Sequence, residues 1–61
     1  MTLTITIECD NAAFERRGEQ EVSRILERLA KDFRFVGKID GMADQKLMDI
    51  NGNSVGKVRV E

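Results

Sequence analysis

Alternating oxygen-bearing side chains are the most suggestive chemical feature of this sequence. Asp49, Asn51 and Asn53 have the spacing of the first three ligands of a calcium-binding loop. The rest of such a loop is missing, because Ser54 stands at the sixth position where glycine is needed and Val60 at the twelfth where a bidentate acid is needed. Turn chemistry in a hairpin explains these residues better. We therefore predict no metal site and no cofactor.

Cys9 is the only residue whose side chain is an obvious nucleophile. A reactive thiol needs a base beside it, and the sequence contains no histidine. The preceding segment is apolar at odd positions, so its periodicity places Cys9 on the inward face as a small hydrophobic residue. We therefore predict that the protein is not an enzyme.

Basic residues form a stripe along the solvent side of a predicted helix. At 100° per residue they fall within about 120° of one another, and such a stripe could follow a phosphate backbone. The stripe consists of Arg24, Arg28, Lys31 and Arg34. Glu27 interrupts it, and no aromatic residue is interleaved for base stacking. A solvated helix face accounts for the stripe better than a nucleic-acid site, which stays as the alternative.

Length and composition narrow the possibilities further. A chain of 61 residues allows a single domain, residues 1–61, without a cleft between lobes. A core of this size supplies only about 3–5 kcal/mol, so we expect a second subunit, in a homodimer. The formal charge of −1 argues against a sequence-independent DNA binder. The first residues read neither as a signal peptide nor as a membrane span, so we expect a soluble intracellular protein.

Two elements are clear from periodicity. Leu3, Ile5 and Ile7 alternate with polar residues, which predicts a strand with one buried face. Six apolar residues then recur at helical spacing and predict one long helix over about residues 19–34. These residues are Val22, Ile25, Leu26, Leu29, Phe33 and Val36.

The last part of the chain predicts a hairpin. A three-residue loop, residues 51–53, places Ile50 opposite Ser54 and Met48 opposite Gly56. This register gathers Met48, Ile50, Val58 and Val60 on one face. A two-residue turn would place the two valines on the other face from Met48 and Ile50, so we prefer the longer loop.

These elements predict an α+β fold, a single two-layer β-α-β-β domain with one amphipathic helix on a three-stranded antiparallel sheet. The last strand lies between the other two. The expected core consists of Leu3, Ile5, Ile7, Val22, Ile25, Leu26, Leu29, Phe33, Met48, Ile50, Val58 and Val60. The expected uncovered face carries Thr2, Thr4, Thr6, Leu47, Asp49, Val55, Lys57 and Arg59. Leu47 and Val55, the two aliphatic residues of that face, are the expected dimer contact.

Three segments together carry a resemblance to known proteins. They are residues 5–15 (ITIECDNAAFE), 21–30 (EVSRILERLA) and 49–56 (DINGNSVG). In this order they resemble small uncharacterised proteins of tailed bacteriophages and prophages, which pair a "DNAAFE" segment with a terminal "DINGNxVG" hairpin. The resemblance covers most of the chain except the connector around residues 37–44. It implies a bacterial virus or prophage origin, and hence the cytoplasm of a bacterial host, but no activity.

The sequence thus predicts a small non-enzymatic phage or prophage accessory protein that acts by protein–protein interaction with a host or viral protein. We expect the open sheet face to bind this partner, with Leu47, Val55, Lys57 and Arg59 as the contact residues. The alternative is a small nucleic-acid-binding accessory factor that uses the basic helix face.

Overall fold

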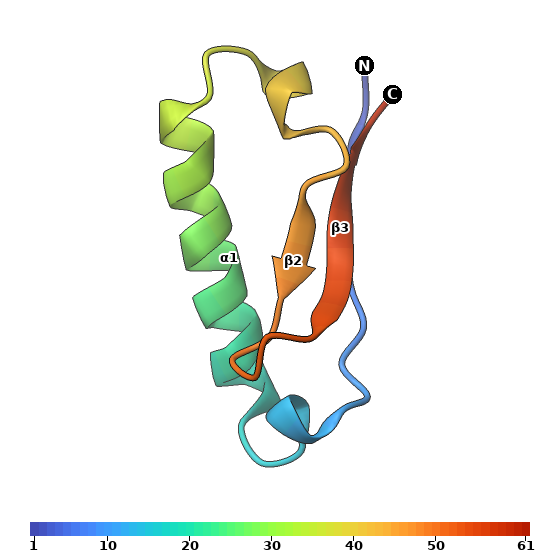
Figure 1. The fold of residues 1–61 in the computed structure, drawn as a ribbon, viewed down its shortest axis with the longest axis vertical. Helices are drawn as coiled ribbons and strands as arrows, with labels where there is room; N and C mark the ends of the chain where they lie inside the picture. The colour runs from blue at the N-terminus through green and yellow to red at the C-terminus, as the bar shows by residue number, and fades with distance from the viewer.

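The computed structural model describes residues 1–61 and has the predicted α+β fold, with one helix packed on a three-stranded antiparallel sheet (Figure 1). In chain order the elements are β1 (Leu3–Ile7), η1 (Ala12–Phe14), α1 (Gly18–Phe35), η2 (Ile39–Met42), β2 (Lys46–Met48) and β3 (Ser54–Val60), where η marks a 3₁₀ helix. The observed helix exceeds the predicted one by a single residue at each end.

The sheet has the order β1-β3-β2, so the predicted central position of the last strand is confirmed. β1 pairs with β3 antiparallel in an unbroken register, from Leu3 opposite Val60 to Ile7 opposite Gly56. The two chain ends lie side by side (Figure 1), where Thr2 and Glu61 exchange backbone hydrogen bonds of 2.6 and 2.9 Å.

Helix α1 forms because its apolar residues make one stripe and its charges suit its dipole. Ile25 and Leu29 lie at the centre of that stripe and are buried. Glu19 and Glu21 occupy the first turn and Arg34 the last, which is the favourable order of charge along a helix. No helix of the structure combines the length and the apolar character needed to cross a bilayer.

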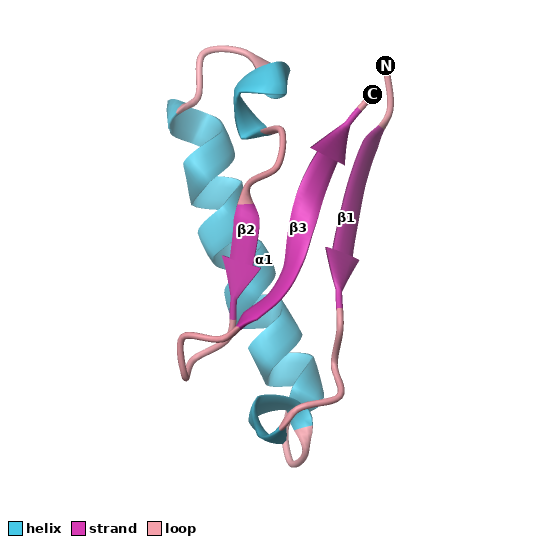
Figure 2. Cartoon of the chain, turned by 45° about the vertical axis from the view of Figure 1, so that its right-hand side comes forward, coloured by secondary structure: helices cyan, strands magenta, loops and turns pink.

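The helix does not cover the sheet evenly. Figure 2 shows α1 running obliquely behind β2, with its C-terminal half on the β2 side of the sheet and away from β1. Leu3 and Ile5 of β1 are consequently 38% exposed each, and Leu26 on the helix is also exposed. The expectation that these three residues belong to the core is therefore wrong within a single chain.

The register of the hairpin also differs from the prediction. Leu47 lies opposite Gly56 and Met48 opposite Ser54, with an irregularity between Leu47 and Met48. Met48 and Ile50, which were expected in the core, are 46% and 70% exposed.

A β-bulge explains this difference. One step along β2 corresponds to two steps along β3, so Val55 is the extra residue. The bulge breaks the alternation of β3, and Val55 and Val58 both become buried although they are three residues apart. Leu47 is likewise 5% exposed and Val55 7%. The expectation that Leu47 and Val55 lie on the open face as a dimer contact is therefore wrong.

The buried core is small and draws on every layer of the fold. It consists of Phe14, Ile25, Leu29, Met42, Leu47, Val55 and Val58. Ile7, Val22, Phe33 and Val60 pack against it as partly buried side chains.

Gly56 allows β1 and β3 to approach each other at the bulge. A Cβ atom at this position would lie 1.8 Å from the backbone oxygen of Thr6, closer than two such atoms can approach. Glycine is therefore required here for space, and the second glycine of the DINGNSVG segment has a structural explanation.

Candidate interaction surface

Asp49 organises the hairpin loop. Its buried carboxylate, 4% exposed, accepts hydrogen bonds from the backbone N–H groups of Asn51 at 2.9 Å and Asn53 at 2.8 Å. The side-chain amide of Asn53 donates a further bond of 3.1 Å. Gly52 has a φ of 84°, in the left-handed region that favours glycine, and its N–H donates to the Asp49 carbonyl.

This arrangement decides the role of the Asp-x-Asn-x-Asn pattern. Asn51 and Asn53 donate their backbone N–H groups to the Asp49 carboxylate, and the Asn53 side chain presents its amide nitrogen, not its oxygen, to the same carboxylate. The pattern is turn chemistry, as the sequence indicated. No group of three or more His, Cys, Asp or Glu residues is placed to hold a metal ion.

Asn11 joins the connector after β1 to this loop. Its side-chain amide donates to the Asp49 carboxylate at 2.7 Å, and its own side-chain oxygen accepts from the N–H of Ala13 at 3.0 Å, which caps η1. The DNAAFE and DINGNSVG segments, which carry the resemblance to phage proteins, therefore meet at one hydrogen bond.

Glu21 and Arg24 join the helix to the same hairpin. The buried carboxylate of Glu21 accepts from Arg24 Nε at 2.6 Å and from the backbone N–H of Ile50 at 2.8 Å. Arg24 also donates to the carbonyl of Met48 at 3.1 Å. Each buried side-chain nitrogen and oxygen atom in the structure has a hydrogen-bond partner. We call Asn11, Glu21, Arg24, Asp49 and Asn53 the hairpin lock.

The lock favours the ionised form of both carboxyl groups. The hydrogen bond from Arg24 lowers the pKa of Glu21 and, with the Ile50 N–H, outweighs the opposing effect of burial. Burial alone would raise the pKa of Asp49, but the hydrogen bonds from Asn53, Asn11 and Asn51 together lower it. Both groups are committed to internal donors, so the lock is a structural cluster.

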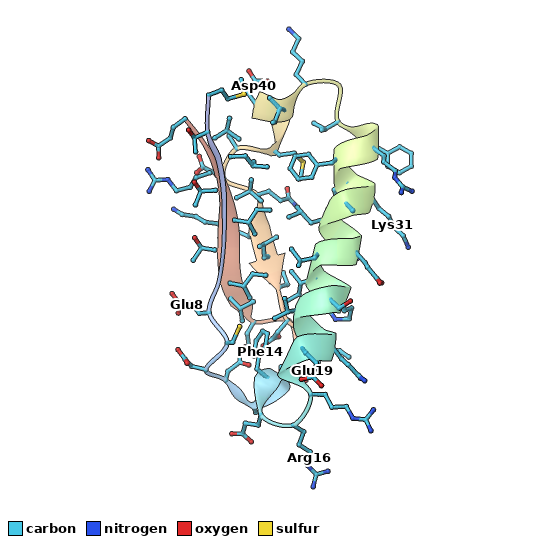
Figure 3. All side chains as sticks on the ribbon, turned by 180° about the vertical axis from the view of Figure 1, so that it is seen from behind. Glu8, Phe14, Arg16, Glu19, Lys31 and Asp40 are labelled. Atoms are coloured by element: carbon cyan, nitrogen blue, oxygen red, sulfur yellow. The ribbon has the colours of Figure 1, made fainter.

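The lock takes Arg24 from the predicted basic stripe, and a separate ion pair involves Arg28. Arg24 is held against Glu21 and the hairpin, and Arg28 lies 4.0 Å from the carboxylate of Asp32. Lys31 and Arg34 are exposed, and Figure 3 shows Lys31 on the side of α1 that faces away from the sheet. A groove of about 230 Å³ between α1 and β2 is lined by both signs of charge, including Arg28 and Asp32. Two of the four basic residues therefore have acidic partners within the chain, whereas Lys31 and Arg34 belong to no ion pair.

The open face of the sheet retains its predicted cations and gains a third. Lys57 and Arg59 of β3 are exposed on the face away from α1, as predicted, and Arg59 pairs with Glu61 at 2.7 Å. Lys46 of β2 lies directly opposite Lys57. The prediction missed Lys46 because the predicted hairpin register was wrong by one residue. That error placed the Lys46 side chain on the other face of the sheet.

The neutral part of the open face comes from β1. Thr4 lies opposite Arg59 and Thr6 opposite Lys57. Figure 3 shows the neighbouring Glu8 pointing away from the helix. A shallow hollow of about 360 Å³ lies on this face, with Thr6, Glu8, Lys57 and Arg59 among its lining residues. We call Thr4, Thr6, Lys46, Lys57 and Arg59 the basic sheet face.

Cys9 lies outside both clusters. It is exposed, and its thiol donates a long hydrogen bond of 3.7 Å to the carbonyl of Ile7. The expectation that Cys9 points inward is wrong, because β1 ends at Ile7 and the alternation of its side chains does not continue to residue 9.

Comparisons with protein-family models, with curated proteins and with solved structures find no match to this chain. The resemblance to phage and prophage proteins stays a prediction that rests on the three quoted segments. The geometry of the surface therefore carries the functional inference.

The hairpin lock predicts a large effect of Asn11 on stability. We expect Asn11→Ala to lower the free energy of unfolding by about 1–2 kcal/mol, because it removes a cap and the bond to Asp49. Asn51→Ala is the matched control, since the Asn51 side chain is exposed and only its backbone contacts Asp49. Urea unfolding followed by circular dichroism measures both. Equal losses in the two variants would contradict the role of the lock.

The lowered pKa values of Glu21 and Asp49 predict acid sensitivity. Their contribution to stability is fully present above the ordinary carboxyl pKa values of 4.5 and 3.8 and is lost as the pH falls through the lower folded values. We expect the free energy of unfolding to drop as the pH falls below about 4.5. Urea titrations from neutral pH to about pH 3 test this, and Glu21→Gln should flatten the curve in that range.

Proposed function

We propose that this chain is a small non-enzymatic accessory protein of a bacteriophage or prophage, acting in the cytoplasm of the bacterial host. Its basic sheet face binds an acidic surface of another protein, of host or viral origin. The observation that carries this proposal is the direct pairing of Lys46 and Lys57 on neighbouring strands.

The paired lysines repel each other within the free chain. Like charges directly opposite on adjacent strands are destabilising. The ion pairs of the structure are Glu21–Arg24, Arg28–Asp32 and Arg59–Glu61, and neither lysine belongs to one. Carboxylates of a partner placed over this face would relieve the repulsion, so binding is favoured both by new ion pairs and by removal of an existing cost.

The composition of this face favours a protein partner over nucleic acid. Sheets that bind single strands stack the bases on aromatic side chains. The aromatic residues of this chain are Phe14 in η1 and Phe33 and Phe35 in α1, so none belongs to the sheet. Thr4 and Thr6 of β1 lie beside Arg59 and Lys57 instead. Such a surface can pair with carboxylates but offers no platform for a base.

A capture experiment with charge-reversed variants tests the proposal. The tagged protein is used to capture partners from a bacterial host lysate with and without nuclease. We expect Lys46→Glu combined with Lys57→Glu to abolish capture of a protein that survives nuclease treatment, because the basic sheet face becomes acidic. The matched control, Lys31→Glu combined with Arg34→Glu, makes the same change of charge on the helix and should retain the partner.

The opposite pattern would overturn the proposal. If the helix variant loses its partner, the sheet variant keeps it and nuclease abolishes capture, the basic helix face binds nucleic acid. Equal retention by both variants would show that neither set of cations contributes.

The repulsion itself can be measured without a partner. We expect Lys57→Glu alone to raise the free energy of unfolding by about 0.2–1 kcal/mol at low salt, because a like-charge pair becomes an opposite-charge pair. The double variant with Lys46→Glu restores like charges and should lose that gain. High salt should remove the difference. Urea unfolding of the four proteins of this cycle measures the coupling, and a coupling of zero would contradict the repulsion.

A further inference from the structure

The outer edge of β1 is the least protected part of the sheet. Although β1 has the alternation of a half-buried strand, Leu3 and Ile5 remain 38% exposed. Figure 2 shows β1 as the outermost strand, with no other segment of the chain along its outer edge. The apolar side chains of this strand therefore lack the cover that their pattern indicates.

The backbone N–H and C=O groups of β1 that are not bonded to β3 belong to its apolar residues. Thr2 exchanges both backbone hydrogen bonds with Glu61, and Glu8 donates to Val55. Bonding residues alternate in an antiparallel pair, so the even-numbered residues of β1 bond to β3. The N–H and C=O groups of Leu3, Ile5 and Ile7 consequently point away from the sheet.

The other edge of the sheet is protected in several ways. β2 is three residues long, carries Lys46 and lies beside the bulge of the hairpin. Arg24 also donates to the carbonyl of Met48 on this strand. β1 has five residues, all uncharged and none of them proline, and its pairing with β3 has no bulge. None of the usual devices against edge pairing is present on β1.

We propose that two copies of this chain pair through β1, antiparallel, about a two-fold axis at Ile5. In this register Leu3 lies opposite Ile7 of the partner subunit, and Thr4 lies opposite Thr6 of the partner subunit. The strand Leu-Thr-Ile-Thr-Ile has the same pattern of apolar and polar residues in both directions, so each side chain meets one of its own kind. The same register joins the outward N–H and C=O groups of each copy to those of the other.

This pairing creates one continuous sheet. Because the two-fold axis is perpendicular to the sheet, both α1 helices lie on one side and both basic sheet faces on the other. The half-exposed Leu3 and Ile5 side chains of the two copies then pack against each other on the helix side. The dimer is independent of the proposed function. Its contact is β1, and not the predicted contact residues Leu47 and Val55, which are buried in the core.

Sedimentation equilibrium with an edge-blocked variant tests the proposal. Because the Ile5 N–H points away from β3, Ile5→Pro removes an intersubunit donor and leaves the internal ladder complete. We expect the wild type to be a dimer at high micromolar concentration, Ile5→Pro to be a folded monomer, and the control Ile5→Ala to retain dimerisation more than tenfold better than Ile5→Pro. Circular dichroism confirms folding. A wild type that stays monomeric up to millimolar concentration would overturn the proposal.

Cysteine cross-linking tests the register without altering the apolar edge. In a Cys9→Ser background, chains with Thr4→Cys are mixed with chains carrying Thr6→Cys and oxidised. The proposed register brings these two positions to a Cα separation of about 4.5 Å, while two copies of the same variant lie about 7–8 Å apart. Disulfides form at the first distance and not at the second. Cross-linking in the mixture alone supports the register, whereas its absence, or equal cross-linking in the unmixed samples, would overturn it.

Discussion

The structure depends on one buried carboxylate, that of Asp49. An ionised group can leave water only if donors surround it, and Asp49 receives N–H groups from Asn11, Asn51 and Asn53. The loop must fold around the carboxylate to supply them. The connector after β1 must also approach it to bring Asn11. Two parts of the chain far apart in sequence are therefore positioned by a single charge.

The sequence prediction succeeded for the regular elements and failed where the hairpin is irregular. Strand order, helix limits and the burial of Ile25, Leu29 and Val58 followed from periodicity, because those elements are regular. Periodicity could not show that the Asp49 side chain closes the loop or that Val55 forms a bulge. A slip of one residue then exchanges the two faces of a strand, so every error in the hairpin has one origin.

The candidate site shows the same division. The positions of Lys57 and Arg59 on the open face were predicted correctly because both residues follow the bulge, where the alternation of β3 is regular again. Lys46 was missed because it lies on the strand whose register was wrong. For the basic stripe, the limit of the prediction was different. Helical spacing shows which residues share a face, but it does not show that Arg24 is held by Glu21 and the hairpin.

The hairpin lock also determines what the helix leaves uncovered. Glu21 and Arg24 hold α1 to the hairpin, on the side of the sheet that contains β2. A single helix held there cannot also cover β1, so the apolar side chains at Leu3 and Ile5 stay half exposed. Pairing through β1 would bury them without bringing cations together, because this strand is uncharged and separates Lys57 of one copy from the other copy. β1, the strand that the hairpin lock leaves uncovered by α1, is therefore also the strand best suited to the centre of a dimer.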